Sequence, residues 1–236
     1  MMNEVQQRNR CRSVRLPGFH TMMKKPKLLI ADDHLIVSEG LRCMLEPEFE
    51  VLGLVSNGLE LIEAALKLSP DVIVSDITMP VLNGIDAAIQ LRTQSTFSKL
   101  IFLTMHRDVA YARRAMEAGA AGYLLKQSAS TELTDAIREV FQGRTYVSPV
   151  IASELLDSYR NDSHPIAAHR KPLTTRQRQV LQLVAEGRTA KEVARLLEIS
   201  VRTAEAHKAK IMETLGFSNT TELIQYSIRN GIISSE

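Results

Sequence analysis

The chain has 236 residues, of which 44% are hydrophobic, 24% charged and 5% aromatic, and its formal net charge is +2. At about 100–200 residues per domain, this length predicts one or two domains, each with its own core. The composition excludes collagen-like, fully disordered and disulfide-scaffold proteins. Because no apolar run approaches the roughly 18 residues that span a bilayer, we expect no transmembrane helix and no membrane partner.

The two cysteines, Cys11 and Cys43, are too few to build a metal cage by themselves and are typical of a reducing, cytoplasmic protein. Cys43 lies in an apolar stretch and is expected in the core. The charge is uneven, since residues 24–145 carry 13 basic and 16 acidic residues, whereas residues 160–236 carry 12 basic and eight acidic ones. This asymmetry predicts two domains with different partners, nucleic acid being the default for the basic one.

Residues 1–24 are polar and carry four arginines, without the apolar segment of a secretory signal. We interpret them as a disordered extension, or as the result of a start assigned too early, with Met22 or Met23 as the true start. A basic arm with a function of its own is the remaining alternative.

From residue 25 to residue 145, short β-rich runs alternate with amphipathic helical stretches. Five βα units predict a doubly wound α/β domain, with a five-stranded parallel sheet and helices on both faces. In such sheets, ligands bind at the carboxyl ends of the strands. The strands are predicted at residues 27–31, 50–55, 72–75, 99–104 and 122–125. The helices are predicted at residues 35–45, 59–68, 85–93, 109–118 and 131–141.

Chemically active side chains stand where these strands end. The first strand ends in Asp32 and Asp33, the third runs into Asp76, the fourth ends at Thr104 and the fifth at Lys126. Clustered carboxylates repel one another unless a cation lies among them, and Mg²⁺ prefers such oxygen ligands. Each residue alone is compatible with a helix cap or an ordinary strand end. Five of them at corresponding strand ends predict one site.

With these residues, and with Met79, Pro80 and Gly84 after Asp76, residues 25–145 resemble the receiver domain of bacterial two-component response regulators. The resemblance implies the flavodoxin-like strand order 2-1-3-4-5. It also implies that Asp76 accepts a phosphoryl group from a sensor histidine kinase.

The same resemblance assigns a role to each of the other residues. Mg²⁺ and Lys126 would neutralise charge on the transferring oxygens. Thr104 would hydrogen-bond the new phosphoryl group, and Tyr123 matches the aromatic residue that turns inward when Thr104 shifts. A plain core aromatic is the alternative for Tyr123. The implied Mg²⁺ ligands are Asp32, Asp33, Asp76 and the backbone carbonyl of Thr78.

Two histidines lie beside these positions. We expect His34 to be a polar residue at a helix start, and His106 to modulate access to Asp76 and the lifetime of its phosphoryl group. A phosphatase of the haloacid-dehalogenase type also uses a nucleophilic Asp, but it needs a second Asp two residues later. Because Thr78 stands there, we expect no enzyme beyond the domain's own phosphoryl transfer and dephosphorylation.

Residues 146–171 are predicted to link two domains. Ser148 and Pro149 are typical of an N-cap and a first helical position, so a short helix is expected to about residue 158. The residues that follow, rich in Asn, Asp, Ser, His and Pro, predict a flexible tether.

Residues 172–236 predict a compact all-α domain of four helices, at 175–186, 190–197, 201–215 and 220–230. Only three residues separate the second helix from the third, which is the spacing of a helix-turn-helix. Three of the helix starts carry a capping-box pattern, in the pairs Thr174 and Gln177, Thr189 and Glu192, and Asn219 and Glu222.

The third of these helices carries a mixed polar face that can lie in the major groove of DNA. Val201, Ala204, Ile211 and Leu215 are expected to face inward. The stretches LTTR at 173–176, KEVA at 191–194 and SVRTAEAH at 200–207 resemble the LuxR-type helix-turn-helix module. The resemblance implies base contacts by Glu205, Ala206, Lys208 and Ala209. It implies phosphate contacts by Lys191, Arg202, Thr203, His207 and Lys210.

A receiver followed by this module resembles the NarL/FixJ group of response regulators. The resemblance implies a cytoplasmic transcription regulator that dimerises on phosphorylation and then binds double-stranded promoter DNA. One alternative is a DNA-binding regulator that does not depend on phosphorylation. Another is a protein-interaction regulator with vestigial DNA contacts, against which the basic groups of the third helix argue.

Overall fold

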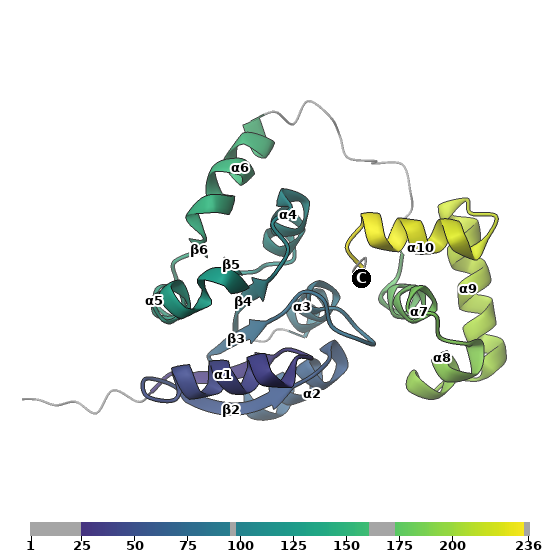
Figure 1. Ribbon diagram of the computed structural model, residues 1–236. Coiled ribbons are helices and arrows are strands. Elements are labelled where there is room, and N and C mark those ends of the chain that lie inside the picture. The colour runs from purple at the N-terminus through teal and green to yellow at the C-terminus, as the bar shows by residue number, and fades with distance from the viewer. Residues whose placement is uncertain (1–24, 95–97, 161–172, 234–236) are drawn as a thin grey trace, which may run out of the picture.

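The computed structural model describes residues 25–94, 98–160 and 173–233, which form two domains (Figure 1). The N-terminal domain is a parallel sheet between two layers of helices, and the C-terminal domain is a cluster of helices. The predictions for residues 1–24 and for the tether at 161–172 lie outside the described residues. Among the helices of the described residues, none is long and apolar enough to cross a membrane.

The sheet has the order β2-β1-β3-β4-β5-β6 over the described residues, which confirms the predicted order of the first five strands. Their bounds also match the prediction: β1 (Lys27–Ala31), β2 (Glu50–Val55), β3 (Val72–Ser75), β4 (Lys99–Thr104) and β5 (Gly122–Leu125). The two-residue strand β6 (Tyr146–Val147) was not predicted. It pairs in parallel with the edge of β5, so non-local backbone hydrogen bonds create it rather than a sequence pattern.

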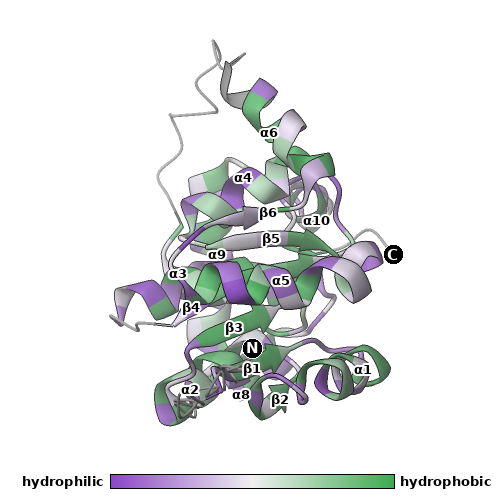
Figure 2. Cartoon of the chain, turned by 90° about the vertical axis from the view of Figure 1, so that its left-hand side faces the viewer, coloured by the Kyte–Doolittle hydropathy of each residue, from purple (hydrophilic) through white to green (hydrophobic). Residues whose placement is uncertain are grey.

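Helices cover both faces of the sheet because side chains alternate along each strand. On one face, Leu28 and Ile30 pack with α1 (Leu35–Leu45) and α5 (Ala129–Phe141). On the other, Leu29 and Ala31 pack with α2 (Gly58–Leu68), α3 (Gly84–Thr93) and α4 (Val109–Glu117). Figure 2 shows the resulting pattern, with mostly hydrophobic central strands and with helices that carry both hydrophobic and hydrophilic residues.

Two further elements complete this domain. The short 3-10 helix η1 (Lys126–Ser128) follows β5, and α6 (Pro149–Arg160) follows β6. Ile151 and Leu155 of α6 join the core beside α4. One expectation for this domain was wrong, because Cys43 of α1 is exposed. The apolar stretch around Cys43 turns Leu41 and Leu45 inward instead.

The C-terminal domain consists of α7 (Thr175–Ala185), α8 (Ala190–Leu196), α9 (Val201–Leu215) and α10 (Thr220–Arg229). The capping boxes at Thr174 and at Thr189 are both confirmed. At the start of α10, however, the Glu222 carboxylate accepts the N–H of Ser218 and not that of Asn219. The expectation for Val201 was wrong, since this first residue of α9 is 39% exposed.

Candidate functional site

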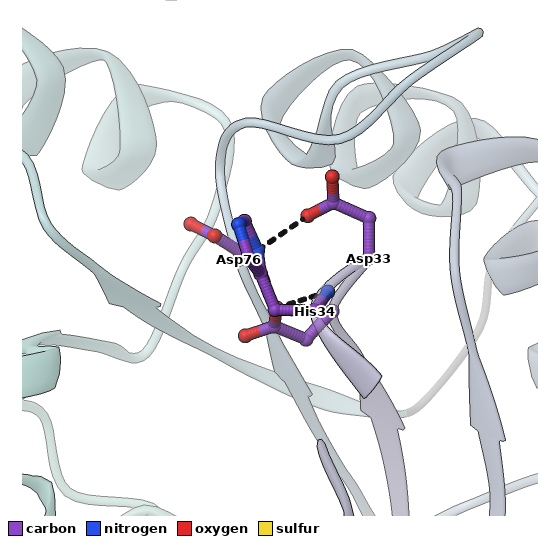
Figure 3. Close-up of side chains that lie close together, drawn as sticks. Asp33, His34 and Asp76 are labelled. Carbon is purple, nitrogen blue, oxygen red and sulfur yellow. Dashed lines mark hydrogen bonds and ion pairs between the residues drawn. The ribbon is translucent and has the colours of Figure 1, made fainter. Parts of the chain in front are cut away.

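An acidic cluster lies at the carboxyl edge of the sheet (Figure 3). Asp32 and Asp33 follow β1, Asp76 follows β3, and these two strands are hydrogen-bonded neighbours. The N–H of Asp76 donates to the carbonyl of Ala31 at 2.8 Å, which aligns the two strand ends. Ligand atoms of Asp32, Asp33, His34 and Asp76 all lie within 4.8 Å of one another.

Lys126 joins this cluster at the same edge of the sheet. It begins η1 directly after β5, and β4 lies between β5 and β3. Its Nζ lies 2.6 Å from Asp32 Oδ2 and 2.7 Å from Asp76 Oδ2. The two carboxylates are only 4% and 6% exposed, and Asp76 Oδ1 also accepts the N–H of Ile77 at 2.6 Å. We call Asp32, Asp33, Asp76 and Lys126 the acidic site. The structure thus brings together four of the five residues that were predicted to converge, and the fifth, Thr104, lies on the neighbouring strand β4.

Burial and charge set the protonation of this site. Burial raises the pKa of the Asp76 carboxyl, and the charge and hydrogen bond of Lys126 oppose that rise. For Lys126, burial acts to lower the pKa of the ammonium, but Asp76 and Asp32 outweigh it, so this pKa is raised. Lys126 therefore stays charged and compensates part of the negative charge.

The donor set fits a hard divalent cation. Three carboxylates face one ammonium, which leaves an excess of negative charge, and oxygen atoms are the ligands that Mg²⁺ prefers. Asp33 supplies the solvent-facing side of the cluster, since its side chain is 31% exposed. Thr78, whose carbonyl was predicted as a ligand, lies two residues beyond Asp76 and lines a cavity with Asp33.

His34 is closer to the acidic site than expected. It is the N-cap of α1, and its ring Nδ1 lies 3.0 Å from Asp33 Oδ1 and 3.3 Å from Asp32 Oδ1. Figure 3 shows this ring among the carboxylates. The signal for this contact was its position directly after the acidic pair.

The loop after β4 connects Thr104 and Tyr123 to the same site. Thr104 is fully buried, and its Oγ1 accepts the N–H of His106 at 3.3 Å. Tyr123 is also buried, and its hydroxyl donates to the carbonyl of His106 at 2.9 Å. The ring Nε2 of His106 lies 2.7 Å from Thr78 Oγ1. Burial lowers the pKa of His106, so this bridge between two loops involves a neutral imidazole.

The outer face of α9 is the second candidate surface. Arg202, Thr203 and Glu205 are exposed on it, whereas Ala204 and Ile211 are buried beneath. Of the other predicted DNA contacts, Ala206, Ala209, Lys210 and Lys191 are exposed, and His207 and Lys208 are half-buried. Lys210 Nζ pairs with Glu213 at 2.9 Å. The helix thus presents a polar outer face of mixed charge while its inner side holds the domain core.

Comparisons with known proteins match both domains. The family model described as response regulator receiver domain matches residues 28–138. The model described as bacterial regulatory proteins, luxR family, matches residues 171–227. The transcriptional regulatory protein LiaR of Bacillus subtilis (strain 168) is 36% identical over 210 residues, which cover 88% of this chain and 99% of LiaR.

Solved structures are similar as well. The crystal structure of a LuxR-family two-component response regulator from Aurantimonas sp. SI85-9A1 is 34% identical and has a TM-score of 0.56. It covers 58% of this chain and 100% of that one. A structure of two RcsB dimers bound to two parallel DNAs is 28% identical with a TM-score of 0.55, and covers 88% of this chain and 99% of RcsB.

Proposed function

Because the chain belongs to the NarL/FixJ group of response regulators, in which a receiver domain precedes a LuxR-type helix-turn-helix, we propose that phosphorylation of Asp76 switches it as a DNA-binding transcription regulator. In this proposal residues 25–145 are the receiver, residues 146–171 connect the domains, and residues 172–236 bind DNA.

The observation that carries the proposal is the placement of Asp76 against Lys126, beside Asp32 and Asp33. A carboxylate oxygen of Asp76 attacks the phosphorus of a phosphohistidine on a sensor kinase. The new P–O bond forms as the P–N bond breaks, and the leaving imidazole takes up a proton from solvent. Bound Mg²⁺, held by Asp32, Asp33, Asp76 and the Thr78 carbonyl, would neutralise charge on the transferring oxygens.

The chain's own residues orient Asp76 for this transfer and would respond to the bound phosphoryl group. The N–H of Ile77 fixes one Asp76 oxygen at 2.6 Å, and the Lys126 ammonium lies where charge develops on the phosphoryl group. The Thr104 hydroxyl, now paired with the N–H of His106, is one strand away and would bond the new phosphoryl oxygen. Tyr123 is hydrogen-bonded to the same loop through its hydroxyl, which donates to the carbonyl of His106, so it would move when that loop moves.

DNA would be bound by the outer face of α9 in the major groove. Glu205, Ala206, Lys208 and Ala209 would reach base edges, whereas Lys191, Arg202, Thr203, His207 and Lys210 would contact phosphates. The similar protein RcsB, solved as dimers on DNA, supports both the DNA partner and a homodimer on activation.

The experiment is the solution mass of the purified chain with Mg²⁺, with and without beryllofluoride as a phosphoryl mimic, compared with Asp76→Ala. We expect a shift from monomer to dimer in the parent chain only. A parallel titration of duplex DNA at several salt concentrations should show an affinity that falls steeply with salt, because phosphate contacts release counterions.

Each alternative predicts a different result. A regulator that does not depend on phosphorylation would bind DNA equally with and without beryllofluoride and with Asp76→Ala. A protein-interaction regulator with vestigial DNA contacts would show the mass shift but no salt-dependent affinity for DNA.

A further inference from the structure

The N-cap of α1 differs from those of the next three helices. Asn57, Asn83 and Asp108 cap α2, α3 and α4, and the side chain of each accepts a backbone N–H of its own helix. His34 begins α1 without any such side-chain bond. Histidine is also not among the residues that N-caps favour most, which are Ser, Thr, Asp and Asn. Capping of α1 therefore does not explain why an imidazole stands at this position.

The His34 ring turns instead toward the acidic site. Its Nδ1 lies 3.0 Å from Asp33 Oδ1 and 3.3 Å from Asp32 Oδ1. The backbone N–H of His34 also donates to Asp32 Oδ1 at 3.0 Å, which fixes the residue beside the carboxylates. In Figure 3 a dashed line joins the ring to Asp33, with Asp76 beside them. A single N–H aligns well with only one acceptor, whereas a cation placed among these groups is bound by all of them.

The separations between these atoms suit the ligands of one ion. On an octahedral ion with bonds of about 2.1 Å, two ligands at right angles lie about 3.0 Å apart and two opposite ligands about 4.2 Å apart. The distances from the His34 nitrogen to the two carboxylates are of the first kind. One ligand atom from each of Asp32, Asp33, His34 and Asp76 lies within 4.8 Å of all the others. Only small movements would therefore bring the four atoms onto one ion.

Lys126 leaves this side of the acidic site free for a cation. Its Nζ lies 2.6 Å from Asp32 Oδ2, whereas the His34 ring faces Oδ1 of the same carboxylate. Three carboxylates and one ammonium leave two negative charges, which one divalent cation balances. An imidazole binds a metal ion in its neutral form, so His34 adds a donor atom without changing this balance.

The His34 side of the acidic site is also open to solvent. The side chains of His34 and Asp33 are 62% and 31% exposed, whereas that of Asp32 is 2% exposed. A cation can therefore enter between His34 and Asp33 and keep water molecules as its remaining ligands.

We propose that His34 is a metal ligand through Nδ1, and that the acidic site binds a first-row transition-metal ion, from Mn²⁺ to Zn²⁺, more tightly than Mg²⁺. Carboxylate oxygens suit Mg²⁺, but an imidazole nitrogen strengthens the binding of transition-metal ions and adds little for Mg²⁺. The role of the ion beside Asp76 rests on the proposed function, whereas ligation by His34 can be measured by itself.

Ligation is tested by pulsed EPR on the full chain, without an affinity tag and loaded with Mn²⁺ alone. A nitrogen bound directly to Mn²⁺ modulates the electron spin echo of the ion. We expect this nitrogen coupling in the parent chain and its loss in His34→Ala. That variant should fold, because the side chain is mostly exposed and caps no N–H of α1.

His106→Ala is the matched control, since it removes the other imidazole of the described residues that lies near Asp76. The ring of His106 contacts Thr78 Oγ1 at 2.7 Å and not the carboxylates. We expect this variant to keep the nitrogen coupling. No coupling in the parent chain, a coupling that survives in His34→Ala, or equal losses in the two variants would overturn ligation by His34.

The preference among ions is tested by calorimetric titration of Co²⁺ and of Mg²⁺ into the parent chain and His34→Ala. Since even the outer partners of metal ligands are worth about 10–100-fold in affinity, loss of the ring should weaken Co²⁺ binding at least about tenfold. Binding of Mg²⁺ should change by less than about twofold. An equal loss for both ions, or tighter binding of Mg²⁺ than of Co²⁺ by the parent chain, would overturn the preference.

Failure of this inference can be told apart from failure of the proposed function. If Mn²⁺ binds without nitrogen coupling, ligation by His34 fails and the metal site of the receiver stands. If the parent chain binds none of Mn²⁺, Co²⁺ and Mg²⁺, both fail. Incorporation of phosphate at Asp76, measured by intact mass, tests the proposed function independently of His34.

Discussion

The acidic site and the outer face of α9 are assembled in opposite ways. The acidic site draws side chains from the ends of β1, β3 and β5, with Asp32 and Asp76 buried, and its residues are as far apart in the chain as Asp32 and Lys126. The face of α9 comes from one continuous helix, Val201–Leu215, and most of its side chains are exposed. One surface needs the whole domain to exist, and the other needs only a helix that is correctly capped and packed.

This difference determines how strongly charge acts at each place. Attraction between Lys126 and the buried carboxylates is little screened by water, so each partner matters to stability as well as to function. The pair between Lys210 and Glu213 lies in solvent, where such pairs contribute little. We therefore expect substitutions in the acidic site to change folding and switching together, and substitutions on α9 to change DNA binding alone.

The largest effect is expected from Asp76→Asn, which keeps the shape of the side chain and removes the nucleophile. Incorporation of phosphate from a small phosphodonor should be lost completely, as measured by intact mass. Because Asp76 and Asp32 repel each other and Asp32 still pairs with Lys126, the chain should remain folded. Phosphate found on another residue of this variant, in the amount seen for the parent chain, would contradict Asp76 as the acceptor.

Lys126→Met is expected to lower the free energy of unfolding by about 3 kcal/mol, because it leaves two buried carboxylates without their cation. Added Mg²⁺ should restore part of this loss. It should therefore raise the free energy of unfolding of Lys126→Met more than that of the parent chain. Urea unfolding with and without Mg²⁺ measures both effects. Arg138→Met is the matched control, since it breaks an exposed ion pair with Glu48 and should change stability too little to detect. An equal change in the free energy of unfolding in the two variants would contradict the expected difference between buried and exposed ion pairs.

Lys210→Ala should weaken binding to duplex DNA several-fold, whatever its sequence. The slope of log Kd against log salt should become shallower by about one, because one phosphate contact is lost. Unfolding by urea should be unchanged, since Lys210 is exposed. Glu213→Gln removes the neighbouring acid and should tighten binding slightly. A loss of DNA affinity that does not depend on salt would argue against a phosphate contact at this residue.

The smallest effect is expected from pH, through Glu186 of α7. Burial in the contact with the receiver raises the pKa of this carboxyl above 4.5, and the bonds from Gln182 and the Val81 N–H oppose the rise. The state in which α7 contacts the receiver thus binds the proton more tightly than the state in which the two domains are apart. This contact should be strongest below pH 4.5 and weaken as pH rises through the raised pKa. Distances between spin labels on the exposed Cys43 and on Thr221→Cys, after Cys11→Ser, should show a modest opening across this pH range in the parent chain and a flatter profile in Glu186→Gln. A steeper pH dependence of these distances in Glu186→Gln than in the parent chain would contradict the assignment of this pH effect to Glu186.

Local pattern was enough to predict most of the elements. The first five strands begin and end at the predicted residues because each is a short, mostly apolar run. The helix starts at Thr174 and Thr189 were predictable because their capping hydrogen bonds join residues only three positions apart. The convergence of Asp32, Asp33, Asp76 and Lys126 followed from one further rule, that ligands gather at the carboxyl ends of parallel strands.

Sequence by itself thus determined the two domains' element types, the sheet and the identity of the acidic cluster, since these depend on periodicity and on residues that end strands. Only the tertiary structure decided the rest, including strand β6, the exposure of Cys43 and the place of the His34 ring. It alone brought Gln182 to Met79, 103 positions away, and the end of α10 to Tyr111. Such contacts depend on how the surfaces of two folded domains pack against each other. The sequence around a glycine or a glutamine has no local pattern that predicts which distant residue it contacts.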